Sequence, residues 1–144
     1  MFKICNYCNR KYEYNSECSC DGANKAKKRR QQHYDKYVRK SSENKKYDTF
    51  YHSKEWERMA EHIKNKYNNL CVMCLIDRSE PIPYDVIHHI YEIKTGIGWK
   101  ERLNEELLIP LCHDCHGKQH LNYTQDKIER LIKILNKYKE LYEV

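Results

Sequence analysis

Long apolar runs are absent from this 144-residue sequence, and no segment approaches the roughly 20 apolar residues of a transmembrane helix. Residues 1–5 also lack the apolar core that a signal peptide carries. Hydrophobic residues make up only 40% of the chain and Phe occurs twice, so there is little material for a large core. We therefore expect a cytoplasmic protein with no membrane partner, whose fold needs stabilisation beyond hydrophobic burial.

Cysteine, in contrast, is plentiful. Eight cysteines in a reducing compartment favour metal binding over disulfides. Cys71-x2-Cys74 and Cys112-x2-Cys115 form two hooks, and together they match the ligand set of one tetrahedral Zn²⁺. Four thiolates leave no position for water, so this zinc is expected to be structural. His113 lies inside the second hook and is a conceivable substitute ligand, although four cysteines suffice.

A second cysteine set lies in residues 1–22 and comprises Cys5, Cys8, Cys18 and Cys20. About twenty residues are too few to fold on apolar burial alone. Zinc binding contributes about 10–16 kcal/mol of folding free energy in zinc-finger peptides, which is enough to order such a segment. We predict an N-terminal zinc knuckle built on a short hairpin. The alternative is a tail with reduced thiols.

Positive charge is concentrated in residues 23–48. The whole chain carries a formal net charge of +6, and this segment holds a basic run opposed only by Asp35. Such asymmetry favours a nucleic-acid partner. We expect a basic linker or helical arm that follows a phosphate backbone, with a solvated spacer as the alternative. The run consists of Lys25, Lys27, Lys28, Arg29, Arg30, Lys36, Arg39 and Lys40, and the expected DNA contacts are Lys27, Lys28, Arg29 and Arg30.

Two amphipathic helices are predicted outside the cysteine hooks. Within residues 49–68, apolar side chains recur at helical spacing after Ser53, which is a plausible N-cap. Residues 124–142 repeat this pattern after Thr124. The apolar stripe of the second helix either packs on its own domain or meets a partner helix.

The histidines suggest the chemistry. His88 and His89 lie on a predicted strand at residues 84–90, so their side chains point to opposite faces. His116 and His120 lie one turn apart on a helix and share a face. His88, His116 and His120 can therefore make one divalent-metal site with open positions, which leaves His89 facing outward beside it. We treat the other histidines as incidental: His33, His52, His62 and His113.

These features together resemble the HNH endonucleases, and among them the small phage-type proteins with a four-cysteine zinc. The matching stretches are the zinc hooks, "DVIHHI", "LIPLC", "CHDCHGKQH" and the preceding Tyr51-x4-Trp56-x-Arg58, over roughly residues 50–120. The resemblance implies an α+β fold: a ββα-metal HNH domain with a structural four-cysteine zinc, flanked by helices and an N-terminal zinc knuckle. We expect a knuckle at 1–22, a basic arm at 23–48, the nuclease domain at 49–123 and a C-terminal helix at 124–144.

The resemblance also implies roles for single residues. His88, His116 and His120 correspond to the ligands of a catalytic divalent ion (Mg²⁺, Mn²⁺ or Ni²⁺), and His89 corresponds to the general base. The family's central asparagine falls on Leu107 in this sequence. Asn104, three residues earlier, is the candidate replacement. The cofactors expected are this ion and one or two structural Zn²⁺, with no organic cofactor.

The implied activity is hydrolysis of DNA phosphodiester bonds, by nicking or cutting, to give 5′-phosphate and 3′-hydroxyl ends. Lys118 either contacts phosphate or is an ordinary surface lysine. By analogy, we expect a phage or prophage protein linked to terminase and genome packaging, in the cytoplasm of a bacterial host. One alternative is a zinc-stabilised nucleic-acid-binding module with little or no catalysis, motivated by the displaced asparagine and the basic arm. Another is an assembly protein that uses the last helix as an interface.

Overall fold

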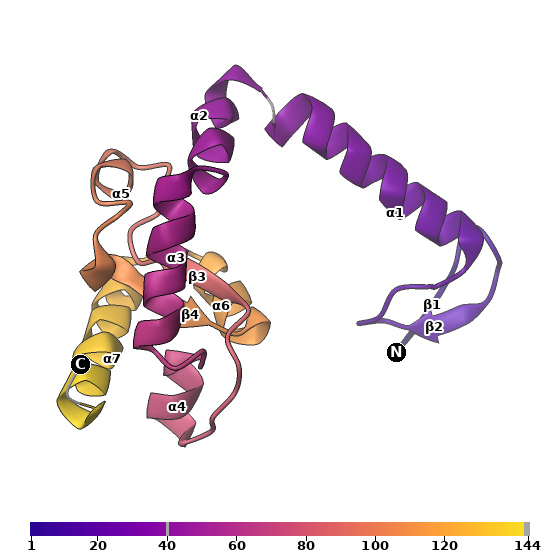
Figure 1. Ribbon diagram of the computed structural model, residues 1–144. Coiled ribbons are helices and arrows are strands. Elements are labelled where there is room, and N and C mark those ends of the chain that lie inside the picture. The colour runs from indigo at the N-terminus through magenta and orange to yellow at the C-terminus, as the bar shows by residue number, and fades with distance from the viewer. Residues whose placement is uncertain (40, 143–144) are drawn as a thin grey trace. The chain divides into compact units, whose positions relative to one another are not determined.

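The computed structural model describes residues 1–39 and 41–142 (Figure 1). Lys40 of the basic run and residues 143–144 of the expected C-terminal segment lie outside the described residues. The chain divides into two compact units, Met1–Asp48 and Thr49–Val144, which are described separately. None of the helices in the described residues has both the length and the apolar character needed to cross a bilayer.

The first unit begins with a small hairpin and continues as helices. β1 (Phe2–Ile4) pairs antiparallel with β2 (Lys11–Glu13). α1 (Asp21–His33) follows, then a π-helical segment (Tyr34–Arg39) and α2 (Ser42–Tyr51), whose last residues belong to the second unit.

The basic run is therefore helical over most of its length. Ala, Lys, Arg and Gln dominate α1, and all of them favour helix. None of the residues of α1 is buried, because the helix has no apolar stripe to pack. Its cationic side chains are left in solvent along the helix.

The second unit is built around a two-stranded sheet and the helix that follows it. β3 (Val86–His89) pairs antiparallel with β4 (Leu108–Leu111), and His88 lies opposite Ile109. α6 (His113–His120) leads on from β4, so β3, β4 and α6 form a ββα unit in an α+β fold. The remaining elements are α3 (Lys54–Lys66), α4 (Val72–Arg78), α5 (Gly96–Lys100), the 3₁₀ helix η2 (Glu105–Leu107) and α7 (Gln125–Tyr142).

The expected helix caps are present. Ser53 Oγ accepts a hydrogen bond from Trp56 N at 3.2 Å, which caps α3, and Asn68 then takes a left-handed φ of 53° just past its end. Thr124 Oγ1 accepts from Lys127 N at 3.4 Å at the start of α7. These positions were predictable because capping is a local interaction.

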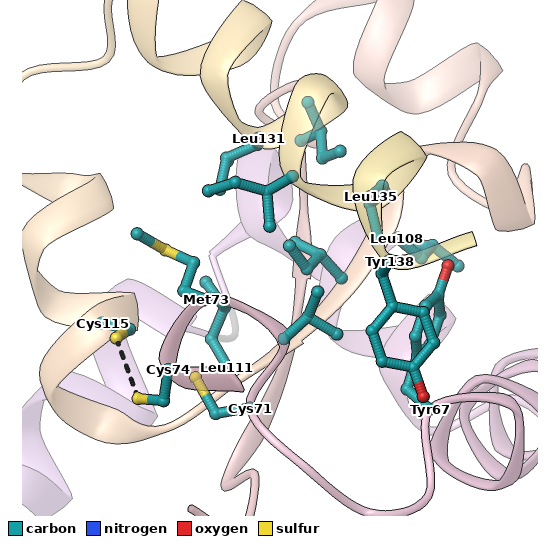
Figure 2. Close-up of a cluster of buried hydrophobic side chains, with 14 of the residues drawn as sticks. Tyr67, Cys71, Met73, Cys74, Leu108, Leu111, Cys115, Leu131, Leu135 and Tyr138 are labelled. Atoms are coloured by element: carbon teal, nitrogen blue, oxygen red, sulfur yellow. Dashed lines mark hydrogen bonds between the residues drawn. The ribbon is translucent and has the colours of Figure 1, made fainter. Parts of the chain in front are cut away.

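The core of the second unit lies between α7, α4 and the sheet (Figure 2). Figure 2 shows the cysteine thiols at one end of this apolar cluster and Tyr67 with Tyr138 at the other. α7 buries five side chains there, so its apolar stripe packs on its own domain. This packing favours the domain-packing alternative over an assembly interface, and Leu141 and Tyr142 at the end of the helix stay exposed. The buried side chains are Ile128, Leu131, Ile134, Leu135 and Tyr138.

Two short helices complete the second unit. α4 begins directly after Cys71 and ends at Ser79 in a left-handed conformation. α5 lies between the two strands. Thr95 Oγ1 caps α5 by accepting from Gly98 N at 3.0 Å. A side chain at Gly98 would collide with the carbonyl oxygen of Glu92, so this helix needs glycine there.

Candidate active site

The cysteine hooks of the second unit converge on one point. Cys74 Sγ lies 3.7 Å from Cys112 Sγ and 3.6 Å from Cys115 Sγ, and Cys71 completes the group (Figure 2). A tetrahedral zinc with Zn–S bonds of about 2.3 Å places its sulfur atoms about 3.8 Å apart. The spacing therefore fits a structural Zn²⁺. Arg78 Nη2 donates to Cys74 Sγ at 2.8 Å and offsets part of the thiolate charge.

The N-terminal cysteines show the same geometry. Cys5 Sγ lies 3.7 Å from Cys20 Sγ, and Cys8 Sγ lies 3.6 Å from Cys18 Sγ. The backbone N–H of Tyr7 donates to Cys5 Sγ at 3.4 Å, a contact that suits a thiolate. Four sulfurs in this arrangement fit a second Zn²⁺, which favours the knuckle over a tail of reduced thiols.

Among the described residues, the third group able to hold an ion consists of His88, His116 and His120. The His88 ring centroid lies 5.3 Å from that of His116 and 5.2 Å from that of His120. His116 Nε2 and His120 Nε2 are 2.9 Å apart. His88 Nε2 is buried and has no hydrogen-bond partner in the described part of the chain. A buried, orphaned imidazole nitrogen that faces two others fits a divalent cation.

The electrostatics of this cluster favour the neutral form of His88 and His116. Burial, helped by the charges that His116 and His120 would carry, lowers the pKa of His88 to about 3. Burial and His120 likewise lower the pKa of His116. Neutral imidazoles have lone pairs to give to a metal, so His88 and His116 can bind an ion at neutral pH.

His89 lies on the other face of β3, as strand alternation requires. The expectation that it faces outward is wrong, because its side chain is only 7% exposed. Trp56 stacks on its ring with centroids 5.0 Å apart and planes 21° apart, and Phe50 meets it edge-on at 6.1 Å. These aromatic residues come from α2 and α3, whose packing against the sheet the strand pattern alone did not reveal.

Both ring nitrogens of His89 have neighbours. Nε2–H donates to the carbonyl oxygen of Arg102 at 3.0 Å, and the hydroxyl of Tyr51 lies 3.4 Å from Nδ1. Burial lowers the pKa of His89 to about 4, against a smaller opposing effect from the Arg102 carbonyl. His89 is therefore a neutral imidazole whose Nδ1 carries the lone pair.

Asn104 forms its side-chain hydrogen bonds with Glu101 and Glu106 and not with His89. It caps η2, where its Oδ1 accepts from Glu106 N at 3.1 Å and its Nδ2 donates to Glu101 Oε2 at 3.0 Å. Both hydrogen bonds stay within the segment that contains Arg102. Leu107, at the place of the family's asparagine, uses its carbonyl oxygen to accept from Ile90 N at 2.9 Å.

Three residues that position the site were missed in the sequence. The Tyr123 hydroxyl donates to the carbonyl oxygens of His89 at 2.7 Å and Ile90 at 2.5 Å, which ties down the end of β3. Asp85 Oδ2 accepts from His113 N at 2.8 Å and caps α6 from another element. An acidic residue before the histidine strand was visible in the sequence. Nothing there marks the carbonyl of Arg102, because a backbone contact leaves no residue-type pattern.

The candidate DNA contacts fall in both units. Lys27, Lys28, Arg29 and Arg30 are all exposed on α1, and Lys27 pairs with Glu17 at 2.5 Å. Lys118 is exposed on α6. It lines a pocket of about 360 Å³ that is also lined by Arg78, Lys127 and Arg130. The structure thus brings the candidate metal ligands together and places Lys118 beside other cations.

Comparison with known proteins gives one informative result. No protein-family model matches the chain, and no curated protein matches it. Among solved structures, the chain is similar to the crystal structure of an HNH endonuclease from the deep-sea thermophilic bacteriophage GVE2, determined with manganese ion. The two are 32% identical, with a TM-score of 0.51, and the match covers 59% of this chain and 89% of that one. The similarity therefore concerns a whole domain and not a single motif.

Proposed function

This chain belongs to the HNH endonuclease family and is a phosphodiester hydrolase, and we propose that it cuts DNA with His89 as the general base. In this proposal His88, His116 and His120 hold the catalytic divalent ion. The observation that carries it is the convergence of these three imidazoles on one face of β3, with the buried, oriented ring of His89 on the other.

The donor set indicates which ions suit the site. Three neutral imidazoles bind Mn²⁺ or Ni²⁺ more strongly than Mg²⁺. The similar phage endonuclease was crystallised with manganese, which supports Mn²⁺ as the first ion to test. When bound, the ion would neutralise charge on the scissile phosphate and stabilise the leaving 3′-oxygen. His88 is the most buried of the three side chains, at 3% exposed, and ties the site to the sheet.

The chain's own residues would handle the proton. His89 Nδ1 has the free lone pair, so it is the atom that accepts a proton from water. The Arg102 carbonyl keeps the ring in this tautomer and steadies the imidazolium formed. Asn104 would act indirectly. Its two hydrogen bonds hold the segment that carries the Arg102 carbonyl, and this carbonyl contacts His89.

The distribution of charge supports DNA as the substrate. Thirteen of the 27 Lys and Arg residues but only six of the 21 acidic residues lie in Met1–Asp48, so this unit carries a formal charge of +7. Thr49–Val144 carries −1. A nearly neutral catalytic unit has little electrostatic attraction for a polyanion. We therefore assign most of the DNA affinity to the first unit, through Lys27, Lys28, Arg29 and Arg30, with Lys118 as a local phosphate contact.

The test is conversion of supercoiled plasmid in the presence of Mn²⁺. The wild-type protein should nick or cut, and EDTA should stop it. His89→Ala should lose at least a hundredfold in rate while still binding DNA. His88→Ala should lose both the reaction and Mn²⁺ binding measured by calorimetry. Wild-type protein that binds DNA without cutting it under any divalent ion would favour the non-catalytic binding module.

We also propose a biological setting. The chain would be a phage or prophage protein that acts beside a terminase in genome packaging, in the cytoplasm of a bacterial cell. The phage origin of the similar endonuclease supports the setting. A neighbouring terminase large subunit, if one is encoded beside this chain, should change the cleavage rate or pattern when the two proteins are mixed. No change and no association on a sizing column would remove the terminase from the proposal.

A further inference from the structure

Three contacts fix the ring of His89. Trp56 covers a face, Phe50 meets an edge, and the Arg102 carbonyl accepts the hydrogen of Nε2. A carbonyl oxygen can only accept, so neutral His89 must carry its hydrogen on Nε2 and its lone pair on Nδ1. The group that lies at this lone pair is the hydroxyl of Tyr51, 3.4 Å away.

Tyr51 differs from the other neighbours of His89 because its hydroxyl can exchange Nδ1 for a water molecule as its hydrogen-bond partner. Its side chain is 40% exposed, whereas Phe50 is 5% exposed. A contact of 3.4 Å is also long for a hydrogen bond from a hydroxyl. Tyr51 thus lies on the solvent side of Nδ1, from which water and a phosphodiester would have to arrive.

The backbone fixes where this hydroxyl lies. Ser53 N and Ser53 Oγ both donate to the carbonyl oxygen of Phe50, at 3.0 and 2.7 Å, and close the turn between α2 and α3 around Tyr51. The Tyr51 ring then packs edge-on against Trp56, with centroids 5.4 Å apart. The turn that places Trp56 against the ring of His89 therefore also places the Tyr51 hydroxyl beside His89 Nδ1.

We propose that Tyr51 is a positioning residue that orients the attacking water on His89 Nδ1, an inference that rests on the proposed role of His89 as the base. Without substrate, the phenol donates to Nδ1. When DNA and water enter, the phenol donates to the water oxygen instead, which turns a water hydrogen toward Nδ1 and an oxygen lone pair toward phosphorus.

The chemistry balances without using the proton of Tyr51. The water proton moves to Nδ1 as the water oxygen bonds to phosphorus. The bond from phosphorus to the 3′-oxygen breaks, its electron pair stays on that oxygen, and the oxygen then takes a proton from bulk water. Tyr51 remains a phenol throughout, so it is neither the base nor a nucleophile, and no covalent protein–DNA adduct forms.

The test uses the full-length, metal-loaded protein and a labelled duplex under steady-state and single-turnover conditions. Tyr51→Phe removes only the hydroxyl. It should lower kcat by roughly tenfold, the effect of one well-placed hydrogen bond, and leave KM, Mn²⁺ affinity and the melting temperature unchanged. Tyr142→Phe, at a tyrosine of similar exposure on α7, is the matched control and should behave as wild type.

Each contrary outcome has a separate meaning. A wild-type kcat in Tyr51→Phe overturns the inference. So does a higher KM at unchanged kcat, because Tyr51 would then bind DNA and not orient water. In a His89→Ala background, Tyr51→Phe should cost nothing further. If His89→Ala itself cuts normally, the proposed function fails, whereas a dead His89→Ala beside a fully active Tyr51→Phe removes only the role of Tyr51.

Discussion

The indole of Trp56 lies flat against the imidazole of His89, with ring centroids 5.0 Å apart and planes within 21° of each other. One residue comes from the first turn of α3 and the other from the end of β3. This stacking joins the aromatic motif before the first zinc hook to the histidine strand. It also explains why the ring of His89, the proposed base, is buried.

Trp56→Leu should leave the proposed base, His89, in place but hold its ring less firmly. We expect a fall in the single-turnover cleavage rate of roughly tenfold to a hundredfold, because small misplacements of a catalytic group are costly. Trp56→Phe keeps an aromatic face and should retain most of the rate. A Trp56→Leu protein that melts earlier yet cuts at the wild-type rate would show that the stacking is purely structural.

Asn104→Ala removes two hydrogen bonds from the segment that carries Arg102. Each bond contributes about 1 kcal/mol, so the Arg102 carbonyl should hold His89 less firmly and kcat should fall about tenfold. DNA affinity, measured by fluorescence anisotropy, should not change. Asn136→Ala, at an exposed position on α7, is the control. Equal activity of the two variants would contradict a bracing role for Asn104.

Metal analysis should find two zinc ions per chain, one for each cysteine group. Cys8→Ser should reduce the content to one and leave the thermal transition of the nuclease unit in place. Cys74→Ser should also reduce it to one, but should abolish that transition, because this zinc joins α4 to α6 beside the core. Two zinc ions in the Cys8→Ser protein would exclude the N-terminal site.

Salt dependence should separate affinity from catalysis. Changing Lys27, Lys28, Arg29 and Arg30 to Gln should lower the slope of log affinity against log salt by up to about four, since each phosphate contact contributes about 0.9. The control changes four cations of the second unit, Lys54, Arg58, Lys133 and Lys137, to Gln. It removes the same charge and should alter the slope little. If the two sets of changes had equal effects, the charge of α1 would act only through the total net charge of the protein.

Stability should depend on pH through His89. Its pKa is about 4 in the folded protein and about 6.5 when unfolded, so between these values the unfolded chain binds more protons. Stability should therefore fall as the pH drops below about 6.5, by up to about 1.4 kcal/mol per pH unit from this residue. His89→Gln removes that contribution, so its melting temperature should fall less than that of wild type between pH 7 and pH 5. Parallel curves for the two proteins would contradict the assigned burial.

Much of the fold and the donor groups could be predicted because the patterns are local. The spacing of the cysteine hooks, the opposite faces of His88 and His89, and the helical spacing of His116 and His120 all follow from short-range geometry. The caps at Ser53 and Thr124 were predictable for the same reason. The roles of the site residues within the mechanism stay predictions until the variants are measured.

The sequence by itself determined which atoms are available: two sets of thiolates, a histidine pair on a strand, a second pair on a helix, and a cationic arm. The tertiary structure alone decided what surrounds His89, the proposed base. Burial of His89, its tautomer through Arg102, and the hydroxyl of Tyr51 at Nδ1 depend on α2, α3 and the α5–η2 segment meeting at one end of β3. Contacts between residues far apart in the chain leave no periodic pattern, and a backbone carbonyl is the same in every residue type.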